Sequence, residues 1–321
     1  MELSAERLER LSAETGFLPR YVEKVVRLLD LLEEIQKHPD LKDQFVLKGG
    51  TALNVFLFDL PRLSVDIDLN FVGETDVTRM KRVRPEIEDA MERVFQRSDL
   101  SIVSKPTDSH SASQWILNYN QATRGKDSIK VDLNYLRRVS ILEPQNIEPS
   151  HIGSFEFESF PVLDINELAA GKLKALFERN SSKDLYDAET LLSETELNEE
   201  KLRVAFVVYG ASAREDWREI SLESLDSKYP NMKNTLPDML QGKERNQLEQ
   251  LVENLTNSVR EGLSIVLPFR DSEKRFLRKI NLEGDIDPSL ITDKANLQKR
   301  IKKDPALHWK VKNVKDHFGL N

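Results

Sequence analysis

Two adjacent glycines, placed between a short apolar segment and a predicted helix, constrain this chain more than any other feature. The segment Phe45–Leu47 has the character of a short strand, and Lys48, Gly49, Gly50 and Thr51 follow it directly. Paired glycines let backbone N–H groups approach a ligand closely, because no side chain stands in the way. A helix that begins near Thr51 points the positive end of its dipole toward an anion. The sequence therefore predicts a strand–glycine–helix unit that can hold phosphate groups.

An acidic pair follows on a second predicted strand. Asp66 and Asp68 alternate with apolar residues within the stretch Arg62–Leu69. Residues two apart on a strand share a face, so both carboxylates point to one place. Two carboxylates on a core strand need compensation, either by basic side chains in a structural salt bridge or by a metal ion. Beside a phosphate-binding loop, the pair has the chemistry required by a nucleotide-bound magnesium ion.

A third carboxylate, Asp132, is expected on a strand spanning residues 129–135. Apolar residues occupy one face of this strand and polar residues the other, with Ile129, Val131 and Leu133 opposite Lys130, Asp132 and Asn134. On the residues alone, Asp132 is either a carboxylate available to a metal ion or an exposed residue paired with Lys130 or Arg137.

Complementary charges lie on two predicted helices joined by a short polar turn. Lys172 and Arg179 are seven residues apart and share a face of the first helix. Asp184 and Asp187 are three residues apart and share a face of the second helix. Helices packed side by side would bring the two faces together. The alternative is a plain salt-bridge network, which contributes little to stability. The helices are expected at 166–179 and 183–192, with Asn166 and Ser182 as caps.

These motifs resemble those of the DNA polymerase β superfamily of nucleotidyltransferases, in which a glycine pair opens a helix and an Asp-x-Asp lies on the next strand. The chain is more similar to one branch, the AbiEii-type toxins of type IV toxin–antitoxin systems, because Arg62 and Ser64 precede the acidic pair as an Arg-x-Ser. The helix pair is similar to that family's later motif, with Lys183 in place of the usual arginine. Lysine keeps the charge but lacks the bidentate geometry of arginine. The resemblance covers most of residues 20–195 and, loosely, 308–314.

The resemblance implies an α+β fold, with a polymerase β-like core of mixed sheet flanked by helices and a helical C-terminal part. We expect the core with its N-terminal helices to span residues 1–195 and a helical domain to span 196–321. Other expected elements are two helices within 5–37 broken at Pro19, helices at 51–58 and 77–96, and strands at 45–47, 65–72, 100–103, 114–119 and 155–162.

The resemblance also implies an enzyme that moves a nucleoside monophosphate from a nucleoside triphosphate to an acceptor hydroxyl and releases pyrophosphate. Mg²⁺, or Mn²⁺ in its place, would be the cofactor, and Lys172 would neutralise charge on the β- or γ-phosphate. The implied catalytic residues are Asp66, Asp68, Lys172 and Asp187; the metal ligands are Asp66, Asp68 and Asp132; the nucleotide-binding residues are Gly49, Gly50, Thr51, Arg62, Ser64, Lys172 and Asp184.

The implied partners are an RNA acceptor, with tRNA 3′ ends as the leading class, and a cognate antitoxin. Transfer to a protein hydroxyl would use the same metal site. A second alternative is a non-catalytic nucleotide-binding interaction protein, although intact Asp66, Asp68 and Lys172 favour an enzyme.

Composition narrows the remaining choices. The 321 residues include no cysteine, which excludes disulfides, thiolate metal sites and a cysteine nucleophile and fits a cytoplasmic location. No apolar run approaches the roughly 20 residues of a membrane span, so no membrane association is expected. The net charge is −8, yet the C-terminal region is basic, notably at Lys299, Arg300, Lys302 and Lys303. These residues either hold an RNA locally or form a solvated helix face. Trp115, Trp217 and Trp309 are expected to be core or packing residues.

Overall fold

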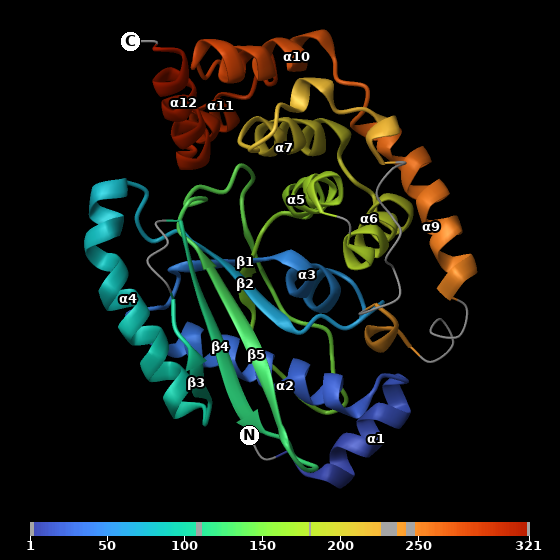
Figure 1. Cartoon of the computed structure of the whole chain (residues 1–321). Coiled ribbons are helices and arrows are strands. Elements are labelled where there is room, and N and C mark those ends of the chain that lie inside the picture. The colour runs from blue at the N-terminus through green and yellow to red at the C-terminus, as the bar shows by residue number, and fades with distance from the viewer. Residues whose placement is uncertain (1–2, 107–110, 180, 226–235, 242–247, 320–321) are drawn as a thin grey trace. The chain divides into compact units, whose positions relative to one another are not determined.

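The computed structural model describes residues 3–106, 111–179, 181–225, 236–241 and 248–319 (Figure 1). The chain divides into two compact units. The sheet unit comprises Met1–Arg138, Pro144–Leu163 and Pro237–Gln247, and the helical unit comprises Val139–Glu143, Asp164–Leu236 and Leu248–Asn321. The main boundary between the two units lies between residues 163 and 164. The domain division expected near residue 195 stays a prediction.

A mixed seven-stranded sheet forms the centre of the sheet unit, in the order β3-β4-β5-β2-β1-β7-β6. The β2/β5 and β1/β7 pairs are parallel and the other neighbours are antiparallel. This confirms the expected α+β class. The strands are β1 (Phe45–Lys48), β2 (Asp66–Phe71), β3 (Ser101–Ser104), β4 (Ala112–Asn120), β5 (Lys126–Asn134), β6 (Gln145–Ile147) and β7 (Phe160–Val162). The sequence did not predict β6, because its short polar edge strand lacks an apolar alternation.

The alternation predicted for β5 is confirmed. Ile129, Val131 and Leu133 are fully buried, whereas Lys130 and Asp132 are partly exposed. On β2, Ile67 and Leu69 are likewise fully buried and the two aspartates are not. The sheet therefore has an apolar face and a polar face, and the polar face carries all three candidate metal ligands.

Helices α1 (Ala5–Thr15), α2 (Pro19–Lys37) and α4 (Val77–Arg97) complete the sheet unit. Pro19 begins α2, as expected, because a proline in the first turn forfeits no helical hydrogen bond. Helix α2 contacts β5 and β7, and α4 contacts β3. The expected helix after the glycine pair begins at Gly49, slightly earlier than predicted, as α3 (Gly49–Thr51) and continues as a π-helical segment (Ala52–Leu57) beside β1 and β2 (Figure 1).

The helical unit is built around α7, whose residues Leu202–Ala211 are all buried. Phe206 of α7 packs edge-on against Trp217, with ring centroids 5.1 Å apart. A buried ion pair joins Arg203 to Glu273, at 2.7 Å. The helices are α5 (Ile165–Glu178), α6 (Ser182–Glu194), α7 (Glu199–Ala211), α9 (Leu248–Gly262), α10 (Asp271–Arg278), α11 (Ala295–Lys303) and α12 (Pro305–Phe318).

The helix pair predicted from its charges is α5 and α6, but both expected caps were wrong by one or two residues. Asp164 caps α5, since its carboxylate accepts a hydrogen bond from the Asn166 N–H at 2.8 Å. Ser181 precedes α6, so that Ser182 is its first helical residue. A carboxylate at the N-cap satisfies an otherwise unpaired backbone N–H and interacts favourably with the positive end of the helix dipole.

No helix in the described part of the chain combines the length and hydropathy of a membrane span.

Candidate functional site

Four polar side chains lie in register across neighbouring strands of the sheet unit. Lys48 of β1 pairs with Asp68 of β2, Asp68 pairs with Asp132 of β5, and Asp132 pairs with Gln114 of β4. Directly paired residues of adjacent strands point to the same face. We call this set, Lys48–Asp68–Asp132–Gln114, the acidic row. Asp66 pairs with Lys130 two residues along the same strands, so the register brings the three aspartates predicted as metal ligands to one face.

The basic and amide groups around the acidic row bind its carboxylates. Gln114 Nε2 donates to Asp132 Oδ1 at 2.7 Å, and Lys130 Nζ lies 2.5 Å from Asp132 Oδ2. Lys48 Nζ lies 3.8 Å from Asp68 Oδ1. The ion pair between Asp132 and Lys130 named as the structural alternative is therefore present. Asp68 and Asp132 keep about a quarter of their side-chain surface exposed (28% and 27%) and stay accessible to a ligand.

The pKa of Lys130 reflects the negative charge on this face of the sheet. Burial alone would lower the pKa of the Lys130 ammonium, but the hydrogen bond to Asp132 and the charges of Asp132, Asp66 and Asp68 raise it above its ordinary value. Three carboxylates thus act together on one cation. A face of this kind attracts a positive ion.

Gly49 and Gly50 fit tightly against the strand that carries the acidic pair. Gly49 has φ +78°, and a β-carbon on it would overlap the Asp68 carboxylate oxygen Oδ2. A β-carbon on Gly50 would lie 2.7 Å from Ser64 Oγ and 3.1 Å from Arg62 Nη2. Gly49 therefore requires glycine for its left-handed backbone as well as for space, and a larger residue at position 50 would force Ser64 or Arg62 to shift. The glycine pair brings the backbone beginning α3 against the Asp68 carboxylate.

Thr51 and Ser64 join this glycine turn to β2. The Thr51 hydroxyl is fully buried, donates to the Asp66 carbonyl at 2.5 Å and lies 3.1 Å from Ser64 Oγ. Asn54 Nδ2 donates to the Gly50 carbonyl at 2.9 Å. These bonds fix the turn relative to the acidic pair. The nucleotide contact expected of the Thr51 and Ser64 side chains stays a prediction, and the hydrogen bonds indicate a positioning role for them.

Arg62 lies inside the sheet unit, beneath Gly50. Its side chain is buried (2% exposed), donates from Nη1 to the Leu63 carbonyl at 2.9 Å and lies 3.9 Å from the Met239 sulfur. A buried guanidinium carries its charge close to the glycine turn without reaching solvent. Its expected contact with nucleotide is not tested by this geometry.

The donor set fits a magnesium ion. Within the described residues, no group of three or more carboxylate or imidazole side chains is gathered closely enough to hold a metal unaided. Mg²⁺ seldom uses such a cage, since it binds through one or two carboxylates, phosphate oxygens and water. Asp66 and Asp68, with Asp132 on the adjoining strand, supply oxygen ligands of this kind beside a turn suited to phosphate.

A second charged cluster lies in the helical unit and confirms the predicted meeting of two helix faces. Lys172 Nζ of α5 lies 2.6 Å from Asp187 Oδ2 and 3.5 Å from Asp184 Oδ1 of α6. Arg179 Nε lies 3.5 Å from Asp184 Oδ2. The side chains of Lys172, Asp184 and Asp187 are 10%, 5% and 0% exposed. Such burial distinguishes this cluster from a surface salt-bridge network, because buried charges must be paired.

The sequence analysis did not identify Lys48 and Gln114 as members of the acidic row, or Asn54 as a partner of the glycine turn. Lys130 was placed on the polar face of its strand, but was named only as an alternative partner of Asp132. Alternation on a strand could have placed Gln114 on the polar face as well. Their proximity to Asp132 depends on strand register, which a single sequence does not specify.

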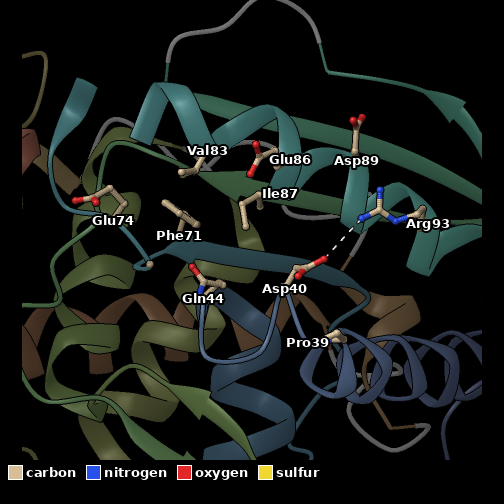
Figure 2. A pocket seen from close by; sticks show the side chains of 11 residues that line it. Pro39, Asp40, Gln44, Phe71, Glu74, Val83, Glu86, Ile87, Asp89 and Arg93 are labelled. Atoms are coloured by element: carbon tan, nitrogen blue, oxygen red, sulfur yellow. Dashed lines mark ion pairs between the residues drawn. The ribbon is translucent and has the colours of Figure 1, made fainter. Parts of the chain in front are cut away.

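A cavity of about 620 Å³ in the sheet unit does not belong to this site (Figure 2). It lies between α4 and the end of β2, where Phe71 points to the face opposite Asp66 and Asp68. Its carboxylates outnumber its single arginine, Arg93, which lies 3.9 Å from Asp40. A cavity of this charge would repel a triphosphate. The acidic residues lining it are Asp40, Glu74, Glu86 and Asp89.

The chain is similar to known proteins in its sequence family and in its fold. Residues 30–279 match the family described as nucleotidyl transferase AbiEii toxin, type IV toxin–antitoxin system. The fold is similar to that of MenT4, a nucleotidyltransferase toxin from Mycobacterium tuberculosis H37Rv, with a TM-score of 0.67 and 15% identity over 96% of this chain and 99% of that one. No curated protein matches the sequence. Because the family match spans most of its length, the chain belongs to the AbiEii family, the nucleotidyltransferase toxins of type IV toxin–antitoxin systems.

Proposed function

We propose that this nucleotidyltransferase is magnesium-dependent and transfers a nucleoside monophosphate to an RNA acceptor, with the 3′ end of tRNA as the leading candidate. The observation that carries the metal site is the acidic row, in which Asp68 lies against Gly49 and beside Asp132. The same arrangement joins carboxylate oxygens to backbone suited to phosphate. The family supports a nucleoside triphosphate as the donor and a cognate antitoxin as the partner.

In the proposed mechanism, the backbone at Gly49 and Gly50 would bind the triphosphate, Asp66 and Asp68 would hold Mg²⁺, and Asp132 would contribute to holding a second ion. When bound, the metal lowers the pKa of the attacking hydroxyl and stabilises charge on the phosphate oxygens. The acceptor oxygen bonds to the α-phosphorus while the bond to the bridging oxygen breaks. The electron pair leaves with pyrophosphate, and the hydroxyl proton passes to solvent.

The remaining site residues position these groups. Thr51 and Ser64 hold the glycine turn against β2, and Arg62 supports Gly50 from beneath. We assign Lys172 to neutralise charge on the β- or γ-phosphate, with Asp187 and Asp184 orienting its ammonium through the ion pairs described above. Catalysis is then mainly positioning and electrostatic stabilisation. We propose the cytoplasm as its compartment, because nucleoside triphosphates and tRNA are available there.

The test is transfer of label from each α-phosphate-labelled nucleoside triphosphate to total tRNA, with and without Mg²⁺. Asp68→Ala should abolish labelling. Asp89→Ala is the matched control, because Asp89 is an exposed aspartate of the same unit outside the acidic row, and it should retain activity. Turnover by Asp68→Ala would contradict the metal assignment. Label that enters protein instead of RNA would establish the protein-hydroxyl alternative, and coexpressed antitoxin should suppress toxicity.

A further inference from the structure

A groove of about 580 Å³ lies in the helical unit, at the C-terminal helix. One wall is a single face of α12, where the lining residues recur in the spacing of a helix. The other walls are the loop after α7, from Ala213 to Arg218, and the π-helical turn at Leu282. All of these elements belong to the helical unit. We call this feature the α12 groove.

Large apolar side chains are exposed in the α12 groove. Trp309 and Phe318 are each 52% exposed and Leu282 is 37% exposed. Of the three tryptophans expected to be core or packing residues, Trp115 and Trp217 lie in the core, at 0% and 1% exposure, whereas Trp309 does not. The Phe318 ring packs edge-on against His317, with centroids 4.8 Å apart. Exposed aromatic rings at a concave surface mark a binding site more often than isolated surface residues do.

The charge of the α12 groove is positive although the chain as a whole is acidic. Among the described residues that line the groove, three are cationic, Arg214, Arg218 and Lys310, and one is a carboxylate, Asp216. Arg218 is paired with Asp216 at 2.5 Å. Arg214 is exposed and makes no ion pair with any residue in the described part of the chain. The groove therefore presents a guanidinium that no described carboxylate pairs with, beside two exposed aromatic rings.

Lys310 contributes a second cation to the groove, and a hydrogen bond fixes the position of its ammonium. Its Nζ donates to the Ala213 carbonyl at 2.8 Å, which holds the α12 wall against the loop after α7. Burial lowers the pKa of the Lys310 ammonium, and the Asp216 charge opposes this shift. A partly desolvated cation gains more from a nearby phosphate than a fully hydrated one does.

Aromatic faces beside cations suit a single-stranded nucleic acid better than a protein surface of similar size. Unpaired bases stack on aromatic rings, and guanidinium and ammonium groups bind the adjoining phosphates. Tryptophan and arginine are also enriched at protein–protein interfaces, but an unpaired nucleotide supplies both a flat base for the indole and a phosphate for the guanidinium. The combination of aromatic rings and positive charge determines our choice of occupant.

We propose that the α12 groove binds an unpaired segment of the RNA acceptor, with a base stacked on Trp309 and a phosphate held by Arg214. The inference rests on the proposed function, because it identifies where the acceptor of that reaction is bound. It also places the RNA contact at Trp309 of α12 and Arg214 of the loop after α7, instead of at the basic residues of α11. Arg300 of α11 is already engaged with the Ser140 carbonyl and with Glu143.

Binding is tested separately from turnover in the Asp68→Ala background. A fluorescently labelled single-stranded RNA of about ten nucleotides, within the range that such sites accommodate, is titrated by anisotropy. Trp309→Ala should weaken binding by about tenfold or more, the effect of losing one stacked base. Arg214→Ala should weaken binding and reduce the slope of log K against log salt by about 1.

Matched controls come from the sheet unit. Val103→Ala removes an apolar side chain that is 60% exposed, and Arg82→Ala removes an exposed arginine. Neither change should alter RNA affinity by more than about twofold, the small effect usual for surface substitutions. Thermal melting should show that the Trp309 and Arg214 variants fold as the parent does, because both side chains are exposed.

In the active enzyme, Trp309→Ala should raise KM for RNA and leave kcat and KM for the triphosphate unchanged. Active transfer with unchanged RNA binding and KM in the Trp309 and Arg214 variants would overturn the inference and leave the proposed function intact. Trp309-dependent RNA binding without transfer to any acceptor would support the groove and overturn the proposed function. If the same variants lose antitoxin binding and keep RNA binding, the groove is a protein interface and the inference fails.

Discussion

Gly49 lies directly against the carboxylate of Asp68, so that any β-carbon on residue 49 would overlap Asp68 Oδ2. The left-handed backbone at Gly49, with φ +78°, gives a second reason for glycine. We predict that Gly49→Ala reduces nucleotidyl transfer by at least about a hundredfold, because displacement of a catalytic group by about 1 Å costs that much. The measurement is single-turnover transfer at saturating triphosphate and Mg²⁺.

Gly125 is the matched control for this substitution. It also has a left-handed backbone, with φ +102°, but a β-carbon there would meet only the Gln121 side chain, at 3.3 Å. Gly125→Ala should carry the same kind of backbone strain, about 1–2 kcal/mol, and keep its activity. Equal losses of activity in the two variants would show that strain, and not the contact with Asp68, is responsible.

Two substitutions of Thr51 test whether its hydroxyl stabilises the fold or binds the triphosphate. Thr51→Val removes its hydrogen bonds to the Asp66 carbonyl and to Ser64 Oγ and should lower the free energy of unfolding by about 1–3 kcal/mol, the net worth of two buried hydrogen bonds. Thr51→Ser keeps the hydroxyl and should retain most of that stability. Urea unfolding measures both effects. A Thr51→Val protein of unchanged stability with a raised KM for the triphosphate would favour the phosphate contact instead.

Local patterns predicted much of this fold. The alternation in β5 placed Asp132 on the polar face, because strand periodicity is decided by residues close in sequence. Helix faces at Lys172 and Asp187 were predicted for the same reason, and their ion pair is present at 2.6 Å. The helix caps were displaced because several polar residues compete for each cap.

Contacts between residues far apart in the sequence, and the exposure of single residues, could not be predicted from local patterns. The pairing of Asp68 with Asp132 follows from the parallel register of β2 and β5, which are separated by three intervening elements of the chain. The exposure of Trp309 depends on what the rest of the helical unit leaves uncovered. Tryptophan is usually well buried, so composition alone favoured the core.

Lys172 and Asp187 are a buried pair, and a double-mutant cycle separates their structural contribution from catalysis. Lys172→Met or Asp187→Asn alone should destabilise the protein by up to about 3–5 kcal/mol, because each breaks the closest ion pair of a buried cluster and removes only one of its two charges. The double variant Lys172→Met/Asp187→Asn removes both charges and should be more stable than either single variant.

Transfer activity is measured on the same four proteins of the double-mutant cycle. The double variant should recover stability and stay inactive, because the proposed phosphate-neutralising ammonium is absent. Chemical denaturation and single-turnover transfer, measured on the same four proteins, give the two quantities. Recovery of activity together with stability would reduce Lys172 to a structural residue.

Lys130 competes with a metal ion for the acidic row. Its ammonium lies 2.5 Å from Asp132 and its pKa is raised by the hydrogen bond and by the three nearby carboxylates, so it stays protonated at about pH 7 to 9. We predict that Lys130→Met lowers the Mg²⁺ concentration needed for half-maximal activity by about tenfold, corresponding to about 1.4 kcal/mol of removed competition. Wild-type Mg²⁺ affinity should show no change attributable to Lys130 over this pH range.

Lys126→Met is the control for that experiment, because Lys126 is an exposed lysine of the same strand that makes no ion pair within the described residues. Its Mg²⁺ dependence should match that of the wild type. Titration with Mn²⁺, followed by the loss of its free electron paramagnetic resonance signal, measures metal binding without turnover. Unchanged Mn²⁺ affinity in Lys130→Met would place the metal away from Asp132, whereas weaker binding would mean that Lys130 orients the carboxylates instead of competing for them.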